Sequence, residues 1–197
     1  MALKLASIFF TMILVDNYVL SKFLGICPFL GVSKKLDSAV GMSLAVTFVM
    51  VMATAATWPI YNLILDPNGL GYLQPIVFIL IIAILVQLLE SILKKYIPTL
   101  YSSLGVYLPL ITTNCAILGV TILNIDNGYN FAESIVCAAG SGIGFLVAMV
   151  LFSGVRRRVE AAEVPKCFEG LPITLISAAI VSLSFFGFAG VIGNLFG

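Results

Sequence analysis

Two of the four cysteines stand at matching places in the sequence and are its strongest candidates for chemistry. The hexapeptide Cys-x-x-Leu-Gly-Val begins at Cys27 and occurs again at Cys115, each time inside a strongly apolar stretch. A cysteine thiolate is a ligand for soft metal ions and for iron–sulfur clusters. A buried thiol that stays protonated behaves instead as a small hydrophobic side chain. The repeated placement favours the first interpretation, and the sequence alone leaves both open.

An iron–sulfur cluster takes four cysteine thiolates, and this chain offers only two at equivalent positions. We therefore predict that a second subunit with the same pair of cysteines completes a [2Fe-2S] site between the two proteins. A disulfide is the other possibility, but it would lie in lipid beyond easy reach of the oxidising machinery. Cys137 and Cys167 lack the symmetry of the first pair and are predicted to take no part in the site.

The remaining residue types exclude several classes of function. The chain has no histidine, so imidazole metal sites and histidine-based acid–base catalysis are excluded for this chain alone. It has no glycine-rich phosphate loop after a predicted strand, so nucleotide binding has no candidate. A net charge of +1 gives no indication of binding to nucleic acid.

The composition is that of an all-α integral membrane protein with a single domain, residues 1–197. Of the 197 residues, 61% are hydrophobic and only 10% are charged, and the mean hydropathy is +1.16. A helix needs roughly 20 mainly apolar residues to cross the hydrocarbon core, and an open sheet edge cannot be hydrogen-bonded inside lipid. The apolar runs predict six transmembrane helices, at residues 5–29, 40–65, 75–93, 100–123, 131–155 and 172–196.

The basic residues predict the orientation of these six spans. Eight of the ten lysines and arginines fall in the first, third and fifth connections, and none falls in the second or fourth. An excess of Lys and Arg in short loops marks the cytoplasmic side of a membrane. We therefore expect the basic loops in the cytoplasm and both chain termini outside.

The spans are also predicted to form two inverted repeats. Aligning Cys27 with Cys115 shifts the numbering by 88, and the stretch from Pro75 matches the stretch from Pro172 at a shift of 97. Each half, about 1–97 and about 98–197, thus holds three spans, and an odd number reverses the second copy in the bilayer. The two cysteines are then expected to meet near the middle of the membrane.

The first helix of each half is predicted to be interrupted near mid-membrane, beside its cysteine. Pro28 follows Cys27, and a proline lacks a backbone donor and disfavours helical geometry in the residue before it. In the second half, Pro109 is followed by Thr112, Thr113 and Asn114, whose side chains can satisfy backbone groups that a break exposes. Non-helical backbone inside the membrane must be shielded from lipid by protein or a cavity. We therefore expect both breaks to face a shared centre, where they leave unpaired amide N–H groups.

Polar residues close to the breaks are candidates for an ion path. Asp16 and Asn17 interrupt the first span, and Thr113 and Asn114 precede the second cysteine. Ionisable residues inside a membrane are functional candidates by default. The alternative is an internal ion pair or a hydrogen-bonded contact with a neighbouring subunit, and the sequence favours neither.

Two further motifs have plainer interpretations. The run Gly-Ser-Gly-Ile-Gly at residues 140–144 is predicted to let helices approach closely rather than to line a pore. The run Arg156-Arg157-Arg158 is interpreted first as a topology anchor, with docking of an acidic cytoplasmic subunit or of anionic lipid as the alternative.

The motifs resemble those of a known family of membrane redox subunits. Residues 23–35 (Phe-Leu-Gly-Ile-Cys-Pro-Phe-Leu-Gly-Val-Ser-Lys-Lys) and 108–120 (Leu-Pro-Leu-Ile-Thr-Thr-Asn-Cys-Ala-Ile-Leu-Gly-Val) are similar to the A-subunit family of the Rnf electron-transport complex, and the resemblance extends over residues 129–134 and 187–190. The sister family, the E subunits of the sodium-pumping NADH:quinone oxidoreductase, usually departs from both motifs. The resemblance therefore favours Rnf, with the sister family as the alternative.

The resemblance implies a membrane subunit of an ion-translocating ferredoxin:NAD⁺ oxidoreductase in the inner (plasma) membrane of a prokaryote. In this family a homologous E-type subunit of opposite topology contributes two more cysteines, and one [2Fe-2S] cluster lies between the pair. Cys27 and Cys115 match the ligand positions of the family. Flavin and NAD are expected only on other subunits, and the coupled ion is Na⁺ or H⁺.

An inverted-repeat secondary transporter is the rival class, because carriers also use broken helices related by inverted symmetry. A carrier needs polar contacts for its substrate at the repeat interface, and this centre offers mainly thiols apart from Thr112, Thr113 and Asn114. A passive assembly scaffold is a third possibility. Iron analysis of the intact assembly distinguishes these classes.

Overall fold

The computed structural model describes residues 2–33, 36–96, 108–162 and 164–196, and within these ranges the chain is helical with no strand. The helices are α1 (Ala2–Leu14), α2 (Ile26–Val32), α3 (Leu36–Ile60), α4 (Gln74–Tyr96), α6 (Leu108–Thr112), α7 (Cys115–Asp126), α8 (Phe131–Glu160) and α9 (Leu171–Phe196). A π-helical turn, Tyr61–Leu65, continues α3, and a 3₁₀ turn, Gly71–Leu73, leads into α4.

The described helices have the length and apolar character of a membrane protein. Three are long and apolar enough to cross a bilayer, at Leu36–Leu65, Gly71–Ile92 and Phe131–Glu160. Shorter apolar helical segments occur at Lys4–Leu14, Leu110–Asp126 and Leu171–Gly187. Large apolar side chains on several helices are exposed, which suits a surface solvated by lipid. The predicted spans at residues 40–65, 75–93 and 131–155 therefore correspond to described helices long enough to cross a bilayer, and the other three stay predictions.

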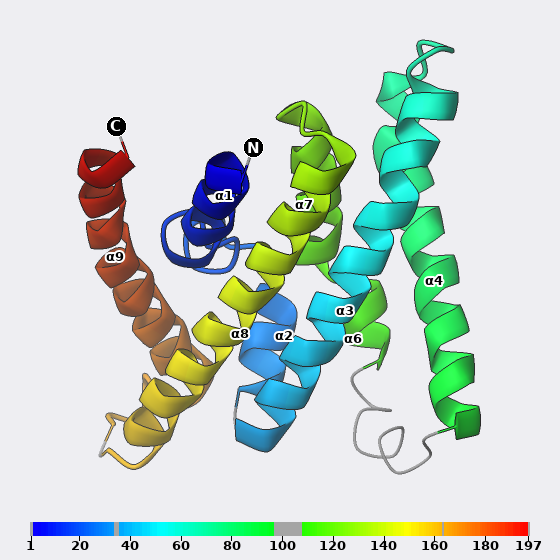
Figure 1. Cartoon of the computed structure of the whole chain (residues 1–197). Coiled ribbons are helices and arrows are strands. Elements are labelled where there is room, and N and C mark those ends of the chain that lie inside the picture. Colours follow the sequence, from blue (N-terminus) through cyan, green and yellow to red (C-terminus); the bar gives the residue numbers. More distant parts are fainter. Residues whose placement is uncertain (1, 34–35, 97–107, 163, 197) are drawn as a thin grey trace.

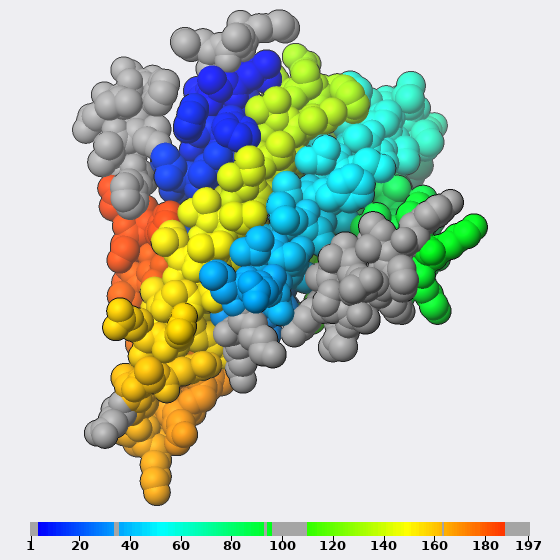
Figure 2. Space-filling view, turned by 60° about the horizontal axis from the view of Figure 1, so that its bottom comes forward, coloured from blue at the N-terminus to red at the C-terminus, as the bar shows by residue number. Residues whose placement is uncertain are grey.

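The central helix of the fold is α8, and α1 and α3 pack along it. Figure 2 shows α8 (yellow) running diagonally between α1 (dark blue) and α3 (light blue). The helices approach closely because α8 presents glycines to both neighbours. A Cβ at Gly142 would lie 2.5 Å from Thr47 of α3, and one at Gly144 would lie 2.9 Å from the Met12 carbonyl of α1. The predicted packing role of the 140–144 run is confirmed at these contacts.

The two ends of the helix bundle carry different connections (Figure 1). α1 begins and α9 ends at the upper end, where the connections from α3 to α4 and from α7 to α8 also lie. The end of α2 and the connection from α8 to α9 lie at the lower end. Lys166 belongs to the connection from α8 to α9, so this basic residue lies at the opposite end of the helix bundle from the start of α1.

Both helices that carry the repeated cysteines are interrupted. Residues 15–25 separate α1 from α2, and residues 113–114 separate α6 from α7. Residues 100–107 of the fourth predicted span lie outside the described ranges.

The first break ends at Gly25, two residues before Cys27, so it lies beside the cysteine as expected. The proline is not part of the interruption, because Pro28 is the third residue of α2. A proline is tolerated there because the first N–H groups of a helix have no intrahelical partner to lose. The helix therefore accommodates Pro28 without a kink, and the interruption falls on the polar residues upstream.

Candidate metal centre

The two repeated cysteines both lie in the first turn of a short helix that follows a break. Cys27 is the second residue of α2, and Cys115 is the first residue of α7. In Figure 1, α2 lies in the lower half of the molecule and α7 in the upper half, so the two helices lead away from the breaks in opposite directions. The N-terminus of a helix carries unpaired N–H groups and a partial positive charge, and both favour an anionic sulfur.

A backbone hydrogen bond joins the two breaks at a cysteine sulfur. The N–H of Gly25 donates to the Sγ of Cys115 at 2.9 Å, across 90 positions of the sequence. Gly25 has a φ of 83°, which is the left-handed region that favours glycine. A Cβ at this position would also lie 3.0 Å from Phe145 and 3.2 Å from the Ala116 side chain. Residue 25 therefore has to be glycine for two independent reasons, its backbone angle and its close contacts.

The two thiols differ in their exposure. Cys27 is exposed, Cys115 is partly buried, and all four cysteines of the chain are free thiols. In the described part of the chain, no group of three or more His, Cys, Asp or Glu side chains could hold a metal ion. A metal centre at the repeated cysteines would therefore need ligands from another chain, and the exposed Cys27 is accessible to one.

Asn17 organises the first break through hydrogen bonds on both sides of its amide. Its Nδ2 donates to the Gly144 carbonyl at 2.8 Å and to the Ile13 carbonyl at 3.4 Å. Its Oδ1 accepts the N–H of Val19 at 3.1 Å. Asn17 is buried. Its bonds to Ile13 and Val19 satisfy backbone groups that the end of α1 and the break expose, and its bond to Gly144 joins the break to α8. The neighbouring Asp16 is partly buried, and the place of both residues in an ion path stays a prediction.

Asn114 ends the second break by capping α7. Its Oδ1 accepts the N–H of Ala116 at 3.0 Å, in the manner of an N-cap residue. Its Nδ2 is buried and has no hydrogen-bond partner among the described residues. Thr113, immediately before it, is exposed. The break thus leaves one buried amide donor on the residue next to Cys115.

Arg156 has a structural role that sequence reasoning missed. Its guanidinium is buried, and Nη1 donates to the Leu30 carbonyl at 2.5 Å and to the Ser33 hydroxyl at 2.8 Å. Its Nε pairs with the Glu160 carboxylate at 3.1 Å, whereas Arg157 is exposed. The contact with Leu30 spans 126 positions of the sequence, so only the helical spacing to Glu160 could have drawn attention to Arg156.

Other features lie apart from the repeated cysteines. A cavity of about 660 Å³ opens between the end of α8 and the start of α9, and neither Cys27 nor Cys115 lines it. Cys137 is fully buried within α8, and Cys167 is exposed in the connection from α8 to α9. The sequence repeat, rather than this cavity, therefore marks the candidate site.

The fold and the site together define a helical membrane protein with a pair of thiols at two adjoining helix breaks. The chain belongs to the Rnf-Nqr family of membrane proteins, because the family model described as Rnf-Nqr subunit, membrane protein, matches residues 5–192. The sequence-based expectation of this family is therefore confirmed.

Close relatives carry names of one kind, all of them A subunits of ion-translocating complexes. The A subunit of the Na(+)-translocating ferredoxin:NAD(+) oxidoreductase complex of Acetobacterium woodii is 57% identical over 189 residues, which cover 96% of this chain and 98% of the relative. The A subunit of the ion-translocating oxidoreductase complex of Syntrophotalea carbinolica is 55% identical, covering 91% of this chain and 93% of the relative. The protein of that name from Aliivibrio fischeri is 51% identical with the same two coverages.

Proposed function

We propose that this chain is the A-type membrane subunit of an ion-translocating ferredoxin:NAD⁺ oxidoreductase, and that Cys27 and Cys115 supply two ligands of a shared [2Fe-2S] cluster. A homologous E-type membrane subunit of opposite topology supplies the other two, and flavin and NAD bind to other subunits of the complex. The names of the relatives support the activity of the complex. The observation that carries the cluster assignment is the Gly25 N–H bond to the Cys115 sulfur, which joins the two breaks at a ligand atom.

The residues at the breaks suit thiolate ligands. The Gly25 N–H stabilises negative charge on the Cys115 sulfur, and the first turns of α2 and α7 add further N–H groups. The unpartnered Nδ2 of Asn114 is also a hydrogen-bond donor, which suits an anionic sulfur. When bound, a [2Fe-2S] cluster supplies a one-electron relay.

We place the six apolar segments across the inner (plasma) membrane of a prokaryote as two inverted three-helix repeats, about 1–97 and about 98–197. The opposite directions of α2 and α7 support this arrangement, as does the common end at which α1 begins and α9 ends (Figure 1). The basic connections then face the cytoplasm and the chain termini face outward, because short loops rich in Lys and Arg remain inside.

Ion transport is proposed to follow from the charge that each electron adds at the breaks. A negative charge in a low dielectric is unfavourable unless a cation approaches it. Asp16 and Asn17 lie within the first break, Thr113 and Asn114 form the second, and these residues are the proposed path for Na⁺ or H⁺. If the midpoint potential of the centre were independent of both sodium concentration and pH, this coupling would be wrong.

The cluster assignment is tested on the complex that copurifies with a tagged chain. We expect iron and acid-labile sulfide in the preparation, and a paramagnetic signal on reduction that Cys27→Ser and Cys115→Ser each remove. Cys167→Ser is the matched control, because this thiol is exposed but lies outside the repeat. An unchanged signal in both repeat variants would overturn the assignment. Solute transport by an iron-free chain would favour the carrier instead.

A further inference from the structure

We infer that Arg156 is a positioning residue for Cys27: from α8, it holds the far end of the short helix whose first turn carries this thiol. The inference rests on the proposed function, because it concerns a ligand of the proposed cluster. Arg156 itself contacts neither thiol in the hydrogen bonds that the structure records, and it acts through α2.

The guanidinium of Arg156 caps α2 at its C-terminal end. Leu30 lies in the last turn of α2, and Ser33 is the C-cap residue. The carbonyl groups of a last turn lack intrahelical donors and carry partial negative charge, so a cation there satisfies both needs. Arg156 is buried, so its bond to the Ser33 hydroxyl is shielded from water and is stronger than at the surface.

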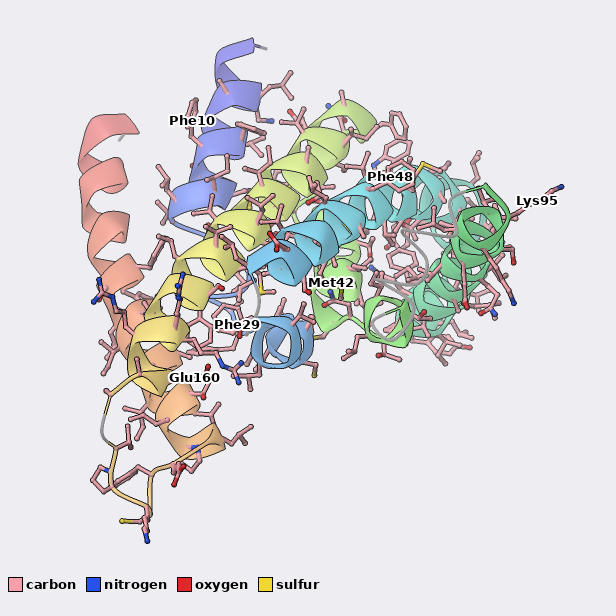
Figure 3. The ribbon with its side chains drawn as sticks, turned by 90° about the horizontal axis from the view of Figure 1, so that it is seen from below. Phe10, Phe29, Met42, Phe48, Lys95 and Glu160 are labelled. Carbon is pink, nitrogen blue, oxygen red and sulfur yellow. The ribbon has the colours of Figure 1, made fainter. Side chains whose placement is uncertain are left out.

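A stacked aromatic pair fixes the same helix one turn along α8. The rings of Phe29 and Phe152 lie 4.2 Å apart with an interplanar angle of 24°. Figure 3 shows Phe29 between α2 and α8, close to the stretch of α8 that carries Glu160. Phe152 precedes Arg156 by four residues, so both contacts come from one face of α8. The Arg156 bonds and the Phe29–Phe152 stack together fix the rotation of α2 about its axis and its position along that axis. Cys27 remains exposed.

Cys115 does not depend on a comparable clamp, by which we mean the Arg156 bonds to Leu30 and Ser33. α7 begins at Cys115 itself, and its N-cap Asn114 lies within the same segment of chain. α7 also packs on α3, α4 and α8, whereas α2 is only seven residues long. Loss of the Arg156 contacts should therefore displace one ligand of the pair and leave the other in place.

The chain offers a matched control at the next residue. Arg157 has the same charge and the same helix, but it is exposed. Arg156→Gln and Arg157→Gln therefore remove equal charge from the lower end of α8. Arg156→Lys keeps the charge and one donor group, and Ser33→Ala removes a single acceptor of the clamp.

The experiment compares these variants in the complex that copurifies with the full chain. For Arg156→Gln we expect iron release to a chelator to be about tenfold faster than in the parent protein. We also expect a broadened paramagnetic signal from the reduced complex and a shifted midpoint potential. Arg157→Gln should match the parent, and Arg156→Lys should recover part of the effect. Should Arg156→Gln fail to assemble, Ser33→Ala must give the same changes in smaller measure.

Hydrogen exchange of the amides in α2 separates this inference from the proposed function. Arg156→Gln should speed their exchange about tenfold relative to Arg157→Gln, because the loss of a charged hydrogen bond releases a short helix. A complex with iron in which Arg156→Gln leaves both the signal and the exchange unchanged would overturn the inference alone. A complex without iron would overturn the cluster, while faster exchange would still support the clamp.

Discussion

Each of the two helix breaks precedes a short helix whose first turn carries a repeated cysteine, but the two breaks differ in length. The first uses residues 15–25 and depends on Asn17 bonds to Gly144 of α8, whereas the second uses residues 113–114 and is closed by its own N-cap, Asn114. The helix after the first break is short, packs on α3 and α6 and is capped from α8 by Arg156, and the helix after the second is longer and packs on three neighbours. Cys27 is correspondingly exposed and Cys115 partly buried.

The two breaks therefore differ in the contacts that fix their geometry. The second break is a compact local structure that fixes Cys115, while the first is an extended one whose geometry is set by distant residues. Gly25 connects them, because its N–H reaches the Cys115 sulfur and its position leaves no room for a side chain. Substitutions should therefore act strongly at the junction, less at the first break, and least within the second.

The largest effect is expected at the junction, for Gly25→Val. A β-branched residue at φ 83° is strained, and its Cβ would lie 3.0 Å from Phe145, so we expect a loss of about 3 kcal/mol in stability. Thermal unfolding of the tagged full chain, followed by size-exclusion chromatography, measures the change. Gly31→Ala is the control, because a Cβ there meets nothing within 4 Å. Equal losses for both variants would show that the junction has no special role.

The first break is tested by Asn17→Ala. The substitution leaves the buried Val19 N–H without its acceptor and removes the bond that ties the break to the Gly144 carbonyl of α8, so a loss of about 2 kcal/mol is expected. Asn62→Ala provides the comparison, since that side chain bonds to its own helix at an exposed position. The same unfolding assay applies, and a neutral Asn17→Ala would mean that water replaces the lost bonds.

The second break is tested by Asn114→Ala, which removes the cap of α7. A lost N-cap lowers stability by about 1 kcal/mol, and Asn114→Ser should restore most of it because serine also caps helices. The smaller effect at this break follows from the packing of α7, which remains intact. A loss larger than that of Asn17→Ala would reverse the order of the two breaks.

The smallest effect is expected for Gly119→Ala in α7. A Cβ there would lie 2.6 Å from Cδ1 of Leu24, which is the mobile end of a side chain. The gain in helix propensity, up to about 1 kcal/mol, should offset the repacking of Leu24, so the unfolding temperature should hardly change. A large drop in the unfolding temperature would show that the Leu24 side chain cannot move and that the packing around it is rigid.

Much of the architecture could be predicted from the sequence, because apolar length and local chemistry control it. The apolar runs mark the helical segments, and the repeated hexapeptide marks two cysteines that follow helix breaks. The first break ends beside Cys27 as expected, but its predicted cause is wrong, because Pro28 is accommodated within α2. Asp16 and Asn17 are the signal of this break, although their polarity alone suggests only an ion path.

The remaining features depend on contacts between distant segments. The bond from Gly25 to Cys115 and the bond from Arg156 to Leu30 join residues 90 and 126 positions apart. No periodicity or motif contains such a pairing, and Arg156 shares its local pattern with the exposed Arg157. Three-dimensional packing is therefore needed to separate the arginine that caps α2 from its neighbours.

The separation of Leu30 and Arg156 in the sequence also constrains the order in which the protein can fold during synthesis. A ribosome delivers the helix with Cys27 early, and the arginine that caps it emerges only after α8 has been synthesised. Until then the carbonyls at the end of α2 lack the guanidinium that caps them, and the proposed positioning of Cys27 is incomplete. Loading of the proposed cluster should accordingly wait until nearly the whole chain has been synthesised.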